Sequence, residues 1–300
     1  MIKKSLLFII GIAMLSLSNN DCANDKTTYS LAVGEDANQR LDFQDSLFRD
    51  RMIQAFKTVD SFKNISGSTI VDFGCGTSST YDGITYLIGS TGQYIGIDAS
   101  KEQITFNKSR FKEALYIVGD ENSAASKAAI SSADIVYLRF VVMHQKNPRD
   151  FVEEIYGAMK PGAILIIQEP EDTEYRKAEM VKKYPFSGNL CDFKIKVGKK
   201  LDLDYSFSKN LEPIFKELKP KRLIHTAEHI YVPLKQAKKL LENNIKEIGK
   251  KDVDKKILTD EEIKNYICDI SKLPEESDDY WNLDFLHTFI AEKGADGAIA

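Results

Sequence analysis

Two aspartates and two glycines in the first half of the chain have the types and spacing of a nucleotide site. Residues 69–78 read TIVDFGCGTS, a β-branched run followed by Asp72 and then by Gly74 and Gly76. Such a run favours a strand, and the glycines let the backbone turn sharply and approach a ligand closely. A second predicted strand ends at Asp98, about 20 residues further on, the offset at which an acid meets a ribose in a βαβ unit.

A glycine pair after a strand also occurs in ordinary tight turns, so the surrounding elements decide its meaning. Apolar runs predict strands and amphipathic runs predict helices, and the two alternate along this part of the chain. The strands are predicted at 69–73, 93–97, 114–118, 134–138 and 163–168, and the helices between them at 81–88, 101–112, 123–130 and 148–159. Strict alternation is typical of parallel strands joined by right-handed crossovers. We therefore predict an α/β fold with a Rossmann-like, doubly wound sheet and helices on both faces.

The rest of the chain divides around this core. An amphipathic helix is predicted at 36–62, and strands at 222–232 and 285–292 bring the predicted sheet to seven strands. Helices are predicted at 234–248 and 259–270, whereas residues 172–219 lack a clear period. We expect an N-terminal helical segment over the cofactor site (25–66), a core (67–171 and 221–293), an inserted substrate lid (172–220) and a tail (294–300).

The N-terminus has the pattern of a secretory signal peptide. Lys3 and Lys4 precede an apolar run at 6–17, and a polar stretch follows at 18–25. That run is too short for a comfortable membrane span. We predict a signal peptide at 1–24 and an exported protein, periplasmic or secreted, with no stable membrane span in the mature chain. A lipid anchor at Cys22 and a buried N-terminal helix are the alternatives, and a chain that does not use the signal would be cytoplasmic.

Composition limits the partners. The 300 residues are 43% hydrophobic, and 41 Lys and Arg face 45 Asp and Glu, a net charge of -4. Without a long basic run, we expect neither nucleic acid nor acidic lipid as a partner. Cys75, Cys191 and Cys268 would remain after removal of the signal peptide, an odd number without close spacing. This pattern supports neither a disulfide framework nor a zinc site, and we expect no metal.

The order of motifs resembles that of the class I S-adenosylmethionine-dependent methyltransferases, especially their small-molecule methyltransferase-domain group. The similarity covers YSLAVGEDANQRLDFQ from Tyr29, VDFGCGTS, YIGIDAS, VGDENS, ADIVYLRFVVMHQKNP, MKPGAILIIQEPE and FLHTFIAEK. The resemblance implies a mostly parallel, three-layer sheet with an antiparallel last strand, and S-adenosylmethionine as the cofactor. Ser78 stands where the family often has a third glycine, which puts the geometry of that turn in question.

The resemblance also implies roles for individual residues. Asp72, Gly74 and Gly76 would line the methionine part of the cofactor, and Asp98 would accept both ribose hydroxyls. Asp120 and Glu121 would contact the adenine. Arg139 would meet the cofactor tail and the substrate, and Arg40 would pair with the cofactor carboxylate.

Each of these residues also has a structural interpretation. Asp120 can be a turn acid, Arg139 can form an ion pair between elements, and Arg40 can face solvent on an amphipathic helix. His144 is the first candidate for a general base and Tyr29 the second. The alternative for His144 is packing or capping of the next helix.

We therefore expect methyl transfer to an unidentified, small-molecule acceptor by in-line displacement. A methyltransferase acting on a protein and a non-catalytic module that binds S-adenosylmethionine are the alternatives. A nicotinamide dehydrogenase is less favoured because the turn lacks GxGxxG spacing. The oligomeric state does not follow from the sequence.

Overall fold

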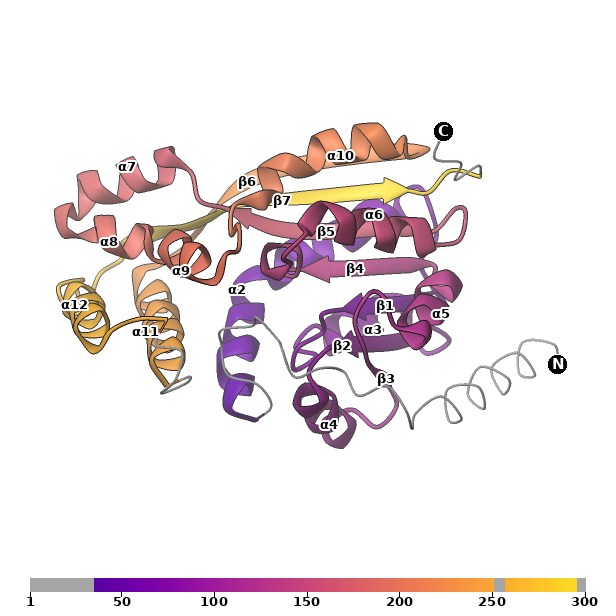
Figure 1. Ribbon diagram of the computed structural model, residues 1–300, viewed down its shortest axis with the longest axis horizontal. Helices are drawn as coiled ribbons and strands as arrows, with labels where there is room; N and C mark the ends of the chain where they lie inside the picture. The colour runs from indigo at the N-terminus through magenta and orange to yellow at the C-terminus, as the bar shows by residue number, and fades with distance from the viewer. Residues whose placement is uncertain (1–34, 251–256, 296–300) are drawn as a thin grey trace.

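One seven-stranded sheet organises the computed structural model, which describes residues 35–250 and 257–295 (Figure 1). Its strand order is β3-β2-β1-β4-β5-β7-β6. The strands are β1 (Thr69–Phe73), β2 (Gln93–Asp98), β3 (Leu115–Val118), β4 (Ile135–Arg139), β5 (Ile164–Glu171), β6 (Arg222–Pro233) and β7 (Tyr280–Glu292). The first five run parallel, and β7 runs antiparallel to β5 and β6. The predicted fold is confirmed.

Helices cover both faces because each buried strand sends alternate side chains to opposite sides. Val71 packs with one face and Ile70 with the other. The helices on the Ile70 face are α2 (Glu35–Asp60), α3 (Tyr81–Ile88) and α4 (Lys101–Arg110). Those on the Val71 face are α5 (Ala124–Ser132), α6 (Pro148–Ala158) and α10 (Leu211–Leu218). The sheet is thus the middle of three layers.

A second group of helices lies beyond the carboxyl ends of β4 and β5, on the left of Figure 1. Its members are α7 (Glu174–Lys183), α8 (Gly188–Cys191), α9 (Phe193–Leu201), α11 (Leu234–Lys250) and α12 (Asp260–Ser271), with the 3₁₀ turn η2 (Pro185–Ser187). These helices share one hydrophobic cluster with the extended ends of β6 and β7, in which Trp281 is fully buried. We call this group the helical cap.

The helical cap does not coincide with residues 172–219, the segment whose sequence lacks a clear helical or strand period. Helix α10 lies inside that segment, yet it packs on the sheet, where Phe215 stacks on Phe289 with ring centroids 5.4 Å apart. Conversely, α11 and α12 follow in the chain after β6 and still join the cap. The cap is therefore built from two separate stretches of sequence.

Most predicted boundaries differ from the observed ones by only one to three residues, but β7 begins five residues earlier than expected, at Tyr280 instead of 285. Asn282 and Asp284 in this stretch are polar yet buried. They have partners there, since Asn282 donates to Glu179 and Asp284 pairs with Lys194. Polar residues such as these are typical of loops, so the sequence alone did not indicate that the strand begins here.

The predicted signal peptide and Tyr29 lie outside the described residues, as does most of the predicted tail. Within 35–250 and 257–295, every helix is too short or too polar to cross a bilayer.

Candidate active site

A cavity of about 560 Å³ lies at the carboxyl ends of β1, β2 and β4, between the sheet and the helical cap. It sits where the strand order reverses direction, the usual ligand position in an open α/β sheet. All the predicted cofactor residues line this cavity, namely Arg40, Asp72, Gly74, Gly76, Asp98, Asp120, Glu121 and Arg139. His144 lines it as well. The fold thus brings together residues that are far apart in the chain, while their individual roles remain predictions.

The glycine turn is fastened to the end of β2. The amides of Gly74 and Cys75 donate to the Ile97 carbonyl at 2.8 and 3.0 Å, and the Gly76 amide donates to Asp98 Oδ2 at 2.9 Å. Gly74 has φ +71°, and a Cβ there would lie 2.5 Å from Cγ2 of Val141. Ser78 also has a left-handed φ, +52°. A serine therefore accommodates the turn where the family often has glycine.

Asp98 connects the loop after β1 to the loop after β2. Its Oδ1 accepts from the Ser100 amide at 2.8 Å, and the Ser100 side chain in turn caps α4 by accepting from Gln103. Burial raises the pKa of Asp98, and the bonds from Ser100 and Gly76 oppose that rise. Each carboxylate oxygen has more than one lone pair, so both retain capacity for a ligand.

The other acids at the cavity are also held by local contacts. Asp72 Oδ2 accepts from Thr80 Oγ1 at 2.6 Å and from the Tyr94 hydroxyl at 2.7 Å. Burial raises the pKa of Asp72, and these two bonds oppose the rise. Asp120 is exposed, and its Oδ1 accepts from the amides of Asn122 and Ser123, both at 3.0 Å. Asp120 therefore serves the turn before α5, whatever else it binds.

Arg40 and Arg139, two of the arginines at the cavity, form ion pairs that tie α2 to distant elements. Arg139 Nη2 lies 2.8 Å from Oδ1 of Asp45, and Arg40 Nε donates to Glu247 on α11 at 2.7 Å. Arg139 Nη1 is buried without a hydrogen-bond partner in residues 35–250 and 257–295. Arg40 does not face solvent: its side chain is buried, and with Gln44 it lines the cavity.

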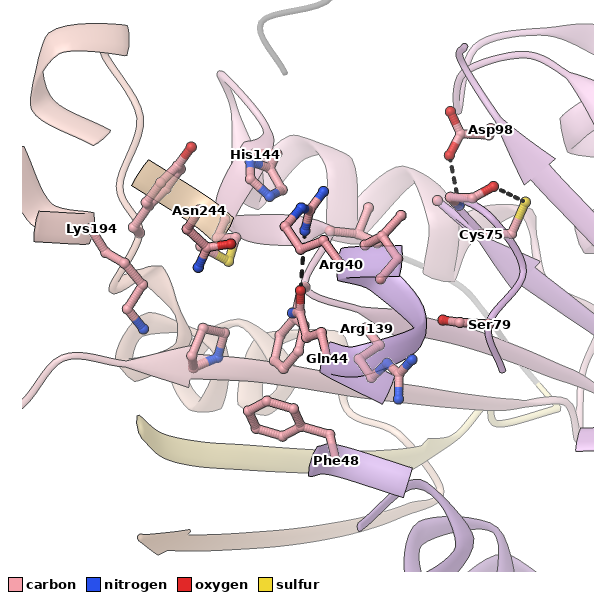
Figure 2. Close-up of a pocket in the computed structure, with 18 of the residues that line it drawn as sticks. Arg40, Gln44, Phe48, Cys75, Ser79, Asp98, Arg139, His144, Lys194 and Asn244 are labelled. Carbon is pink, nitrogen blue, oxygen red and sulfur yellow. Dashed lines mark hydrogen bonds between the residues drawn. The ribbon is translucent and has the colours of Figure 1, made fainter. Parts of the chain in front are cut away.

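Asp45 and Glu247 were not found from the sequence. The spacing of Arg40, Gln44 and Phe48 on α2 was an available signal, because residues four apart share one face of a helix. Figure 2 shows these three side chains together at the cavity.

His144 ends the 3₁₀ turn η1 (Val142–His144) after β4. Burial is the larger cause and the positive charge of Arg40 the smaller one, and together they lower the pKa of His144 to about 4. The imidazole is therefore neutral near pH 7. Its ring meets that of Tyr205 edge to face, with centroids 5.2 Å apart.

Glu169 on β5 fixes the loop that carries His144. Its carboxylate accepts from the amides of Val141 at 2.6 Å, Val142 at 2.8 Å and Met143 at 3.4 Å. Burial raises the pKa of Glu169 to about 7, and the three amides oppose that rise. The QEPE motif contained this residue, but only the fold shows which loop it holds.

The far half of the cavity, which we call the cap half, is largely apolar. Its walls come from α8, α9, α11, β7 and the loop before η3 (Phe207–Asn210), and they include Leu190, Phe193, Val197, Tyr205, Leu240, Leu241 and Leu283. Asn244, Lys194 and Asp284 are polar side chains on this side, and Lys194 is ion-paired with Asp284. Within the described ranges, no group of three or more His, Cys, Asp or Glu is arranged to hold a metal ion.

The sheet order, its reversed seventh strand and a glycine turn beside an acid-lined cavity define the Rossmann-like methyltransferase fold. Comparison with known families gives the same answer, since a family described as "Methyltransferase domain" matches residues 64–259. The chain belongs to this family, as the motifs implied, and it is a class I methyltransferase that uses S-adenosylmethionine.

Individual relatives are distant. A demethylmenaquinone methyltransferase of Lactococcus lactis is 24% identical over 184 residues, covering 57% of this chain and 72% of its own. The crystal structure of the YcgJ protein from Bacillus subtilis shares the fold, with a TM-score of 0.52 and 12% identity over 80% of this chain and 98% of that one. The plantazolicin methyltransferase BpumL, crystallised with S-adenosylhomocysteine, has a TM-score of 0.48 and 14% identity over 86% and 87% of the two chains.

The residues present fit S-adenosylmethionine. The glycine turn brings its backbone to the wall of the cavity, and Asp98 has spare acceptor capacity there. Within the described part of the chain, the buried Nη1 of Arg139 is a donor without a partner, which a carboxylate of the cofactor would satisfy.

Proposed function

We propose that this methyltransferase modifies a small molecule. The observation that carries the proposal is a single cavity that continues from the glycine turn into the apolar cap half. Its volume of about 560 Å³ lies within the usual range for small-molecule sites, roughly 300–1,000 Å³. The name of the Lactococcus lactis relative, demethylmenaquinone methyltransferase, also refers to a small-molecule acceptor.

In this proposal the glycine turn and the acids hold the cofactor. Gly74, Gly76 and Asp72 line its methionine part, and Asp98 accepts from the ribose hydroxyls. Asp120 and Glu121 lie at the adenine end. Arg139 and Arg40 meet the carboxylate end, where Arg139 has the buried donor and Arg40 is braced by Glu247.

The cofactor supplies an activated methyl group, and the chain supplies alignment and exclusion of water. The loop clamped by Glu169 places His144 at the cavity between the two halves. A neutral imidazole can accept the proton that a hydroxyl or amine acceptor loses. Tyr29, the second candidate for that role, lies outside the described residues.

Titration of S-adenosylmethionine into the wild type and Asp98→Ala tests the cofactor site. Loss of a charged acceptor for two hydroxyls costs about 1.5–3 kcal/mol, so we expect affinity to fall by about 10-fold to 100-fold. Asp150→Ala on the exposed surface of α6 is the matched control and should bind as the wild type does. Unchanged affinity in Asp98→Ala would refute the ribose assignment.

Transfer of a labelled methyl group separates the alternatives for the acceptor. Incubation of the protein and labelled cofactor with a cell extract should place the label in the small-molecule fraction. Label in the protein fraction would favour a protein acceptor, and cofactor binding without any transfer would favour a non-catalytic module.

The proposed location is outside the cytoplasm, on the basis of the charged, apolar and polar order of residues 1–25. Fractionation with N-terminal sequencing of the mature protein tests it. A mature chain that begins near residue 25 in the exported fraction is expected, and a cytoplasmic chain that begins at Met1 would contradict export.

A further inference from the structure

We infer that the methyl acceptor is an uncharged, largely apolar molecule with an O–H or N–H group that donates to Asn244. This inference rests on the proposed function and specifies the chemistry of its acceptor. It comes from the charges, the walls and one unsatisfied amide of the cap half.

The positive charges at the cavity are already matched. Each of its four lysine and arginine side chains has a carboxylate partner: Arg40 with Glu247, Arg139 with Asp45, Arg176 with Asp172, and Lys194 with Asp284. Asp284 is itself the acid of the cap half, and His144 is neutral near pH 7. In the cap half, where the described charged side chains already pair with one another, an acceptor with a net charge would lose its hydration without gaining a counter-charge.

The walls of the cap half favour an apolar body. Phe193 and Val197 on α9 face Leu240 and Leu241 on α11, and all four are nearly fully buried. Arg176 adds no recognition of its own, because it is used by the fold: its Nε donates to the carbonyls of Asn282 and Leu283, anchoring α7 to β7.

Asn244 is a polar side chain of the cap half whose hydrogen-bonding capacity the fold leaves unused. It lies on α11 and lines the cavity, and Figure 2 shows it in the region between Lys194 and Arg40. Its Oδ1 is buried and has no hydrogen-bond partner among the residues that the structure describes. A buried acceptor without a donor costs about 1–3 kcal/mol, which a donating ligand would recover. The acceptor therefore needs an O–H or N–H on the side that faces α11.

A matched set of naphthalene derivatives tests this chemistry. Naphthol, naphthoate, naphthylmethylammonium and methoxynaphthalene, substituted at the same ring position, share one apolar body. They carry a neutral donor, an anion, a cation and no donor, respectively. Binding is measured by calorimetry on protein saturated with S-adenosylhomocysteine, in the wild type, Asn244→Leu and Asn243→Leu. Asn243 is the half-buried preceding residue on α11, and it does not line the cavity.

We expect naphthol to bind the wild type at least tenfold more tightly than the other three compounds. Asn244→Leu should remove about tenfold of the naphthol affinity and leave methoxynaphthalene unchanged, whereas Asn243→Leu should change neither. Tightest binding of naphthoate or naphthylmethylammonium would overturn the inference. Equal naphthol binding by the wild type and Asn244→Leu, or no binding of any probe, would also overturn it. If S-adenosylhomocysteine itself does not bind, the cofactor assignment beneath the inference fails instead.

Discussion

At Gly74 the backbone conformation and a neighbouring side chain both require glycine. The φ of +71° is costly for other residues, and Val141 occupies the space of a Cβ. His144 is a different case, since its type permits several roles and its surroundings choose among them. Burial keeps its ring neutral, which a catalytic base needs and a surface histidine would not ensure.

Gly74→Ala should destabilise the protein and weaken cofactor binding together. We expect a loss of about 1–3 kcal/mol in the free energy of unfolding, because the loop from Val141 must move. Gly157→Ala is the control: it lies in α6, no atom of the described residues lies within 4 Å of the added Cβ, and it should gain about 0.5–1 kcal/mol. Urea unfolding measures both, and equal stability of the two variants would contradict the steric argument.

His144→Gln should reduce methyl transfer by about 10²-fold to 10⁴-fold, the usual contribution of a general base. Affinity for S-adenosylmethionine should change little. Because the pKa of His144 is lowered to about 4, the wild-type rate should not fall between pH 7 and about pH 5. The assay uses the acceptor found by the label-transfer screen, with His229→Gln as the control, since His229 does not line the cavity. An acid limb centred near the ordinary histidine pKa would count against this role.

At the scale of elements, the sequence was most informative for helices and strands that a short-range pattern of residues encodes. The buried strands and the capping box of Thr259 with Glu262 follow from short-range pattern, and both are present. The cap did not follow, because its cluster joins residues 180–205 to 230–286 and no local period encodes that contact. Asn244 and Glu169 were missed for the same reason: each acquires its meaning from an element distant in the chain.

The hydrogen bonds from the loop of η1 to the Glu169 carboxylate on β5 predict a specific pH dependence of stability. Burial raises the pKa of Glu169 from 4.5 to about 7, so the folded state binds more protons than the unfolded state between these values. Its stabilising contribution is therefore complete below about pH 4.5 and is lost as the pH rises through about 7. The change is at most about 3 kcal/mol.

Unfolding of the wild type and Glu169→Gln at pH 5 and pH 8 measures this effect. The advantage of the wild type over the variant should be larger at pH 5. A constant difference would show that the Glu169 pKa is not raised.

At the scale of the whole molecule, the cavity lies at the interface between the sheet and the helical cap. Helix α2 contributes to both sides through Asp45, which pairs with Arg139, and Arg40, which pairs with Glu247. A ligand in the cavity would contact β1, α2 and α11 at once. Binding should therefore stabilise elements that are not neighbours in the sequence.

S-adenosylhomocysteine at 100 times its dissociation constant should add about 2.7 kcal/mol to the free energy of unfolding. Amide exchange followed by mass spectrometry should show added protection in α2 and in the loop after β1. Helix α6, whose residues do not line the cavity, reports the global effect. Added amide protection that is no greater in α2 than in α6 would argue against binding in the cavity between the sheet and the helical cap.

The ion pair between Arg40 and Glu247 spans 207 residues of chain. During synthesis on a ribosome, Arg40 emerges long before its partner and remains hydrated, so the pair can form only after most of the chain has been made. The nascent protein therefore completes its cavity late. A fragment that contains the whole glycine turn but ends before α11 lacks this pairing. It also lacks β7, through which β6 joins the sheet, so we expect it to form neither the complete cavity nor the seven-stranded sheet.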